Sequence, residues 1–101
     1  MTGTSESPRD RNGFWEILSL IGDKWVVATI GMLADGPLRY NELKRQIGDV
    51  SQRMLTRTLR RLENEGLITR TVINTIPIGV EYRLTQLGKT LVEPIDGLYQ
   101  W

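Results

Sequence analysis

Hydrophobic residues in the first two thirds of the chain recur every three or four positions, the spacing of one face of an α-helix. The pattern predicts helices over residues 14–21, 24–34, 39–46 and 51–65. Segments rich in Gly, Asp and Pro separate them: Gly22-Asp23, Asp35-Gly36-Pro37 and Gly48-Asp49-Val50. Ser51 is placed to cap the fourth helix, because its hydroxyl can accept a backbone N–H that has no helical partner.

The period changes after Gly66, where residues 67–73 and 80–84 have the composition and alternation of two β-strands. Residues 74–79, which include Pro77, form the loop between them. A last helix is predicted after Thr85 and carries Leu87, and Pro94 predicts a kink or a break in it.

These elements predict an α+β fold, mostly α: a winged helix-turn-helix with a two-stranded β-hairpin wing and terminal helices that form a dimer. The helices at 39–46 and 51–65 are joined by the turn at Gly48. An inward stripe of Leu55, Leu59 and Leu62 leaves the arginines of the second helix outside. Residues 1–12 are expected to be a flexible tail and residues 13–101 one domain.

Composition excludes several kinds of chemistry. The 101 residues contain no cysteine and no histidine, so disulfides, thiol chemistry, the usual zinc sites and a Ser-His-Asp triad are ruled out. The acids are scattered and no phosphate-binding loop occurs, so we expect no enzyme, metal or cofactor. No apolar run approaches the ~18 residues of a membrane span, and residues 1–10 do not read as a signal peptide.

The positive charge is concentrated in the middle of the chain. Between Arg39 and Arg61 there are seven Lys or Arg and two acids, which gives this window +5 although the whole chain is +1. A nearly neutral protein with such a segment presents a positive surface, and on a helix-turn-helix this predicts binding to double-stranded DNA.

The start of a recognition helix reaches base edges and its later residues contact the backbone. Base readers are therefore predicted at Gln52, Arg53, Thr56 and Arg57. Phosphate contacts are predicted at Arg39, Lys44, Ser51, Arg60 and Arg61, and on the wing at Thr75 and Arg83. Three alternatives stay open: a solvated arginine face, a surface salt bridge at Arg39, and a hairpin that only completes the fold.

Apolar and aromatic residues at the two ends exceed what so small a domain can hide. They either cover one another within one chain or form a dimer interface, and we favour the homodimer. The predicted interface residues are Phe14, Trp15, Leu18, Leu91, Ile95, Leu98, Tyr99 and Trp101. Trp25 is expected in the core, with a ligand pocket as the alternative.

Five ordered segments give the chain a family resemblance: 20–25 (LIGDKW), 36–43 (GPLRYNEL), 51–56 (SQRMLT), 59–63 (LRRLE) and 80–88 (VEYRLTQLG). Together they resemble the HxlR-type transcriptional regulators, a branch of the MarR-like winged-helix proteins. The resemblance implies a bacterial, cytoplasmic, homodimeric DNA-binding regulator. It also implies that the terminal helices build the dimer and that the helix after Ser51 enters the major groove.

The chain departs from that family at one place. Many such regulators carry a reactive cysteine followed by proline before the first helix, and this place falls at Asn12-Gly13 here. A thiol switch therefore cannot be carried over. A signal would have to act by binding, and a pocket for a small-molecule effector near Trp25 or the dimer seam is a hypothesis.

The sequence thus predicts a sequence-specific DNA-binding regulator, more often repressing than activating. The alternative is a winged-helix module for protein interaction. In that case the face of Arg53 and Arg57 would bind an acidic partner, and duplex DNA of any sequence would bind weakly.

Overall fold

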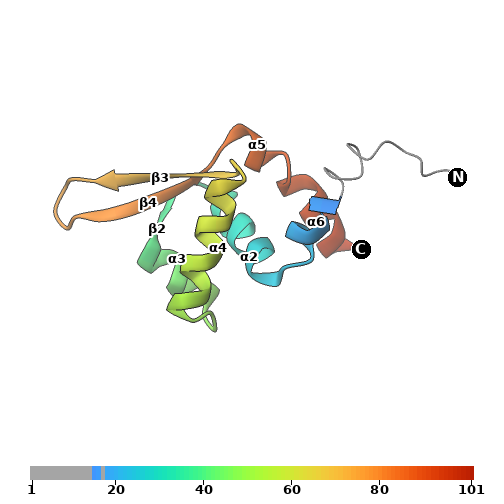
Figure 1. The fold of residues 1–101 in the computed structure, drawn as a ribbon, viewed down its shortest axis with the longest axis horizontal. Helices are drawn as coiled ribbons and strands as arrows, with labels where there is room; N and C mark the ends of the chain where they lie inside the picture. The colour runs from blue at the N-terminus through green and yellow to red at the C-terminus, as the bar shows by residue number, and fades with distance from the viewer. Residues whose placement is uncertain (1–14, 17) are drawn as a thin grey trace, which may run out of the picture.

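The computed structural model describes residues 15, 16 and 18–101, and residues 15, 16 and 18–21 are helical. The expected tail at 1–12, together with Phe14 and the Asn12-Gly13 position, lies outside the described residues. Three longer helices follow: α2 (Lys24–Leu33), α3 (Tyr40–Ile47) and α4 (Gln52–Asn64). The chain then forms β3 (Ile68–Ile73), β4 (Gly79–Leu84), α5 (Gln86–Lys89) and α6 (Val92–Gln100), and β2 (Leu38–Arg39) lies between α2 and α3 (Figure 1).

Helix α2 lies at the centre of the molecule and packs against α3, α4, α6 and β4 (Figure 1). Its side chains Val26, Ile30 and Leu33 are buried, as the helical spacing predicted. The helix begins after Asp23, whose carboxylate accepts hydrogen bonds from the backbone N–H groups of Trp25 and Val26 at 2.9 and 3.3 Å. Asp23 thus caps α2, because its carboxylate accepts N–H groups that have no partner within the helix.

The helix-turn-helix consists of α3, a short turn and α4. Gly48 ends α3 with φ +91°, a backbone conformation that favours glycine. Val50 is buried in the angle between the two helices. The Ser51 hydroxyl accepts a hydrogen bond from the backbone N–H of Met54 at 3.0 Å, as predicted for a cap. Burial of all three leucines of the predicted stripe then fixes which side of α4 faces outward.

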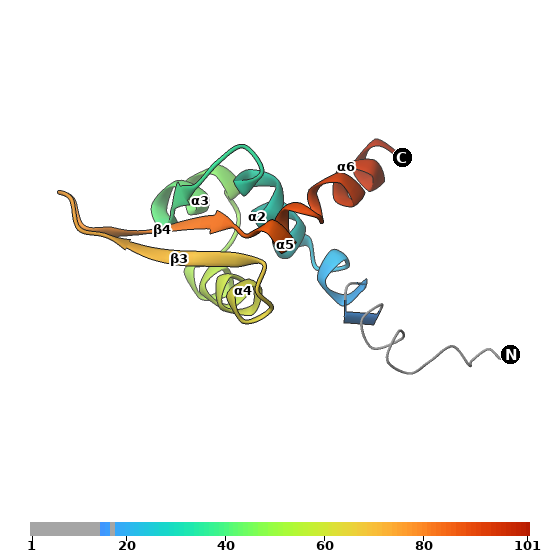
Figure 2. The same cartoon turned by 90° about the horizontal axis from the view of Figure 1, so that it is seen from above.

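The wing belongs to a three-stranded antiparallel sheet with the order β2-β4-β3. Strands β3 and β4 pair from Ile68 opposite Leu84 to Ile73 opposite Gly79, and the hairpin projects well beyond the helices (Figure 2). The predicted two-stranded hairpin of the wing is confirmed, and the structure adds a third strand that was not predicted, because Leu38 and Arg39 pair with Tyr82 and Glu81. A strand of two residues is too short to show alternation, and Arg39 had been assigned to the following helix, which begins at Tyr40.

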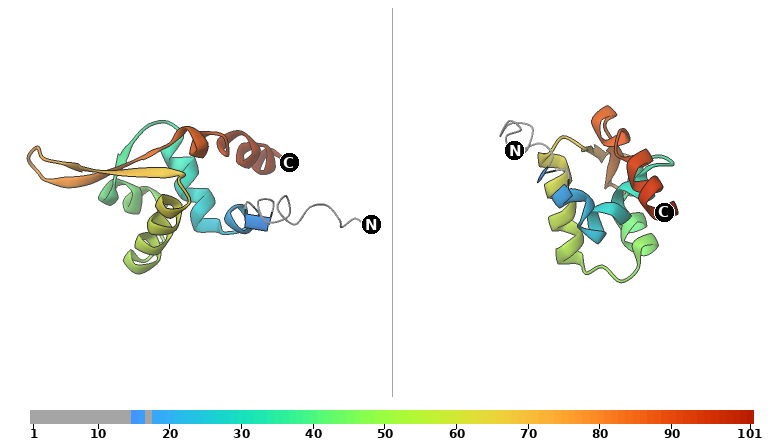
Figure 3. Two further views of the ribbon diagram at one scale, coloured as in Figure 1. Left: turned by 45° about the horizontal axis from the view of Figure 1, so that its top comes forward. Right: turned by 90° about the vertical axis from the view of Figure 1, so that its right-hand side faces the viewer.

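The C-terminal segment is broken at a different place from the one predicted. Helix α5 ends at Lys89 and α6 begins at Val92, so the break precedes Pro94. Pro94 lies in the first turn of α6, where a backbone N–H has no partner within the helix and its loss costs little. Figure 3 shows the red C-terminal helix at the end of the molecule opposite the tip of the wing.

Candidate nucleic-acid interface

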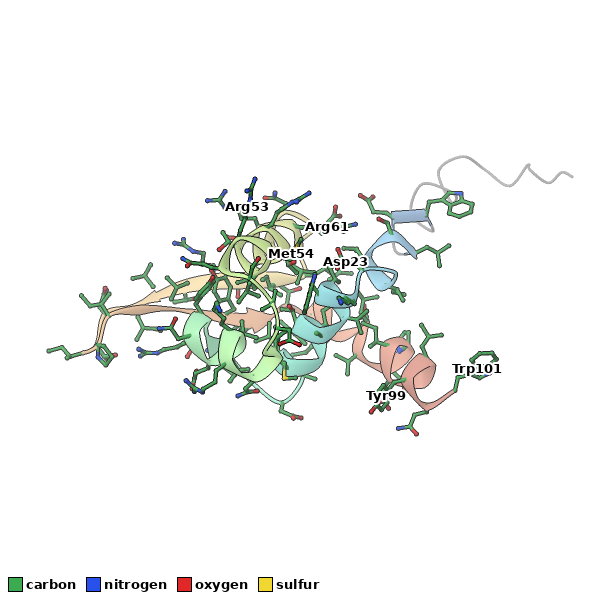
Figure 4. The ribbon with its side chains drawn as sticks, turned by 90° about the horizontal axis from the view of Figure 1, so that it is seen from below. Asp23, Arg53, Met54, Arg61, Tyr99 and Trp101 are labelled. Atoms are coloured by element: carbon green, nitrogen blue, oxygen red, sulfur yellow. The ribbon has the colours of Figure 1, made fainter. Side chains whose placement is uncertain are left out.

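The outer side of α4 carries the most concentrated group of polar side chains predicted to contact DNA. Gln52, Arg53, Arg57 and Arg60 are exposed, and with the half-buried Thr56 they line one shallow hollow along the helix. Arg53 projects from this outer side (Figure 4). The surface therefore offers guanidinium and amide donors in a row over two turns of one helix.

Tyr40 fixes the start of α4 relative to α3. Its hydroxyl donates to the backbone carbonyl of Gln52 at 3.2 Å and lies 3.4 Å from the hydroxyl of Thr56. These contacts hold the first turn and a half of α4 in position.

Arg61 is on the same helix, but its side chain turns toward the N-terminal part of the chain. Its guanidinium lies 3.4 Å from the Asp23 carboxylate and donates to the Ser19 hydroxyl at 2.8 Å (Figure 4). Because Asp23 also caps α2, one carboxylate joins the beginning of α2 to the last turns of α4. The predicted phosphate contact of Arg61 stays a prediction, and the structure adds a bracing role.

The side chains of Arg39 and Thr75, both predicted to contact phosphate, form a hydrogen bond with each other. The Arg39 guanidinium donates to the carbonyl of Pro77 at 2.9 Å and to the Thr75 hydroxyl at 3.4 Å. Its backbone N–H donates to the Glu42 carboxylate at 2.8 Å at the start of α3. Arg39 thus connects the helix-turn-helix to the loop of the wing, and neither sequence-based explanation of Arg39 included this contact.

The remaining predicted cations lie on separate parts of the surface. Lys44 is half-buried in the last turn of α3, and Arg83 is exposed on β4. The Arg83 guanidinium pairs with the Glu81 carboxylate on the same strand at 2.9 Å. An exposed ion pair of this kind contributes little to stability. The carboxylate of Glu81 also offsets most of the positive charge of Arg83.

Arg70 is a residue that sequence reasoning missed. It is exposed on β3, opposite Tyr82, and lines a hollow between α4 and the sheet together with Thr56, Arg60 and Glu63. Side chains two apart on a strand share a face, so Arg70 lies on the same face as the buried Ile68. The alternation of side chains along this strand, counted from Ile68, could have placed Arg70 next to α4.

The predicted dimer residues separate into two groups. Leu91 and Ile95 are only 8% exposed and belong to the core of the single chain. Exposed large side chains remain at the same end of the molecule, with Tyr99 and Trp101 projecting from the C-terminal segment (Figure 4). This exposed group is Trp15, Leu18, Leu98, Tyr99 and Trp101.

Trp25 packs half-buried against the core, in agreement with the favoured prediction. The Lys24 ammonium lies over its ring, 4.6 Å from the centroid. The ligand pocket suggested near Trp25 stays a prediction. In the described part of the chain, no group of three or more His, Cys, Asp or Glu residues is arranged to hold a metal ion. Nor does that part contain a helix long and apolar enough to cross a membrane.

Comparison with known proteins assigns this architecture to a family. The model of the HxlR-like helix-turn-helix family matches residues 20–101. The chain belongs to the HxlR-like family. The predicted resemblance is therefore confirmed, and the winged helix-turn-helix fold agrees with it.

Relatives of this HxlR-like chain are named as transcriptional regulators. An HTH-type transcriptional regulator of Methanothermobacter thermautotrophicus is 48% identical over 81 residues, covering 80% of this chain and 62% of that protein. The chain thus spans less than two thirds of the length of that relative.

Two solved structures are similar to this chain. The redox regulator HypR in its oxidized form matches with a TM-score of 0.81 and 37% identity, covering 88% of this chain and 92% of HypR. A structure described as a MarR-family transcriptional regulator of Porphyromonas gingivalis W83 has a TM-score of 0.79 and 32% identity, covering 94% and 88% of the two chains. Both of these structures are of proteins described as regulators.

Proposed function

We propose that this HxlR-like chain binds double-stranded DNA sequence-specifically as a homodimer and represses transcription by covering a promoter. The observation that carries the proposal is the row of Gln52, Arg53, Arg57 and Arg60 on the exposed side of α4. Guanidinium groups pair with guanine, and a glutamine amide pairs with adenine, in the major groove. Such a protein acts where the chromosome is, so we place it in the cytoplasm of a bacterial cell.

The contacts behind the row support the same function. Tyr40 and Ser51 hold the start of α4. A helix that contacts base edges needs a fixed orientation, because each base contact depends on geometry. Arg60 and Arg70 border the hollow beside the wing, where a DNA backbone leaving the major groove would meet them. Backbone contacts of this kind position a protein on DNA without reading its sequence.

We propose no redox control by cysteine for this chain. HypR is described as a redox regulator, but the 101 residues of this chain contain no cysteine to carry a thiol switch. We propose instead that any signal acts through binding of a ligand or through a change in the amount of protein.

The first experiment measures fluorescence anisotropy with duplex DNA from upstream of the protein's own gene, beside a scrambled duplex, at several salt concentrations. We expect Arg57→Ala to relax base preference by about 1–3 kcal/mol at the contacted position. Arg60→Ala should weaken binding to all sequences and reduce the salt slope by about 1, because one phosphate contact is lost. Lys89→Ala is the control, since it removes one positive charge from α5.

Each outcome separates the possible functions. Preference for the upstream duplex by orders of magnitude, reduced in Arg57→Ala but kept in Lys89→Ala, supports a specific regulator. Weak and equal binding of both duplexes, unchanged by either substitution on α4, would contradict the proposal. It would favour the alternative that the Arg53 and Arg57 face binds an acidic protein.

A further inference from the structure

The tip of the wing is apolar and stands free of the rest of the described chain. Residues 71–80 contain no charged side chain. Ile76 is 97% exposed and Ile78 is 74% exposed. The loop that carries them lies at the end of the molecule opposite the terminal helices (Figures 1 and 3).

The loop is held in shape from outside the hairpin. The Arg39 guanidinium donates to the carbonyl of Pro77, which stands between the two isoleucines, and to the Thr75 hydroxyl, so it binds polar groups of the loop itself. Gly79 allows this approach, because a Cβ atom there would lie only 3.3 Å from the Arg39 side chain. Arg39 thus braces the loop from one side, while the side chains of Ile76 and Ile78 stay exposed.

Two large aliphatic side chains in water at a projecting tip indicate a contact with a partner. The root of the wing is continuous with the proposed DNA surface, since Arg70 and Arg60 line one hollow between β3 and α4. A partner protein could also cover these apolar side chains, but the neighbouring surface on the α4 side carries the exposed Arg53, Arg57 and Arg60. Charge complementarity therefore favours DNA.

We propose that the wing tip is a minor-groove wedge. Ile76 and Ile78 insert between base pairs in the groove next to the one occupied by α4, and Arg39 beside the loop meets a flanking phosphate. Apolar wedges of Ile, Leu, Phe, Met or Pro partly unstack a base step and kink the duplex. This inference rests on the proposed function and adds a second mode of recognition to it.

The wedge also adds specificity of a different kind. Unstacking costs least at pyrimidine–purine steps, which are flexible. The protein should therefore prefer such a step under the wing, at a position where it makes no hydrogen bond to a base.

The test uses the full chain and the upstream duplex of the anisotropy experiment, labelled at both ends for energy transfer and with 2-aminopurine placed in turn at steps under the wing. We expect the double variant Ile76→Ser/Ile78→Ser to bind at least about tenfold more weakly, with an unchanged salt slope because no phosphate contact is lost. The bend and the 2-aminopurine fluorescence should be lost with it. Val72→Ser, an exposed apolar residue on the body of β3, is the matched control.

The outcomes distinguish the wedge from the proposed function. A double variant that binds and bends DNA as the wild type does would overturn the wedge, while loss of preference in Arg57→Ala would still support the regulator. A double variant that changes the oligomeric state in sedimentation would show that the tip contacts a second copy, which also overturns the wedge. If the wild type binds neither duplex specifically, the proposed function fails and the wedge with it.

Discussion

At the scale of single residues, arginines that look alike in the sequence have different surroundings. Arg53 and Arg57 are exposed on α4, whereas Arg61 contacts Asp23 and Arg39 contacts Pro77. Helical periodicity placed the arginines of α4 on its outer face, because it depends only on spacing. It did not give their partners, which lie 38 positions away in the sequence.

The Glu65 carboxyl makes the stability of the fold depend on pH. Burial of its carboxyl, and next the Glu16 carboxyl close to it, raise the pKa of Glu65 above its ordinary value of 4.5, and Arg61 opposes the shift. A carboxyl with a raised folded-state pKa stabilises the fold fully below the unfolded pKa. The contribution is lost as pH rises through the folded pKa. At neutral pH the charged Glu65 is therefore destabilising relative to a neutral group.

We expect Glu65→Gln to melt at a higher temperature than the wild type at pH 7 and to lose less stability between pH 4.5 and pH 7. Thermal melts followed by circular dichroism at both pH values check this. Glu63→Gln is the control, because Glu63 is an exposed acid in the last turn of the same helix. An equal rise in melting temperature for both variants at pH 7 would attribute the effect to an acid at the end of the helix and not to the contact between Glu65 and Glu16.

At the scale of elements, the short helix α5 is fixed tightly to the end of α4. The Thr85 hydroxyl donates to the Gly66 carbonyl at 2.6 Å and accepts from the Gly88 backbone N–H at 3.0 Å. A Cβ atom at Gly88 would lie 2.1 Å from the Leu67 carbonyl oxygen, a backbone atom that cannot turn away. The sequence predicted a helix here but not its contact with Leu67.

Gly88→Ala should therefore destabilise the fold by about 1–3 kcal/mol or more, because the backbone must shift. Gly97→Ala is the matched substitution, since nothing lies within 4 Å of a Cβ at that helical position. It should stabilise the fold by about 0.5–1 kcal/mol. Urea unfolding of both variants measures the two effects, and a neutral or stabilising Gly88→Ala would contradict the close packing of α5.

At the scale of the whole molecule, the two ends and the side of the chain differ in character. The α4 side carries arginines, the wing tip carries exposed isoleucines, and the opposite end carries exposed aromatic residues (Figure 4). We propose that this last end is the dimer interface. A two-fold dimer would present two recognition helices about one turn of DNA apart.

Leu98→Glu tests the interface by placing a charge among Leu98's exposed apolar neighbours. We expect the wild type to sediment as a dimer, and the variant to sediment as a monomer and bind DNA more weakly. Val72→Glu changes a similarly exposed residue on the wing and should remain a dimer. A wild type that is monomeric at working concentrations, or a Leu98→Glu variant that stays dimeric, would contradict this interface.

The sequence by itself determined the helices, the Ser51 cap, the Gly48 turn, the buried stripe of α4 and the family. Each of these depends on residues within a few positions of one another, or on motifs in a fixed order. Only the tertiary structure decided that Leu38 and Arg39 form a strand, that the C-terminal segment breaks before Pro94, and that Arg39 braces the wing. It also separated the buried Ile95 from the exposed Leu98. These features depend on which distant segments meet, and local spacing does not contain that information.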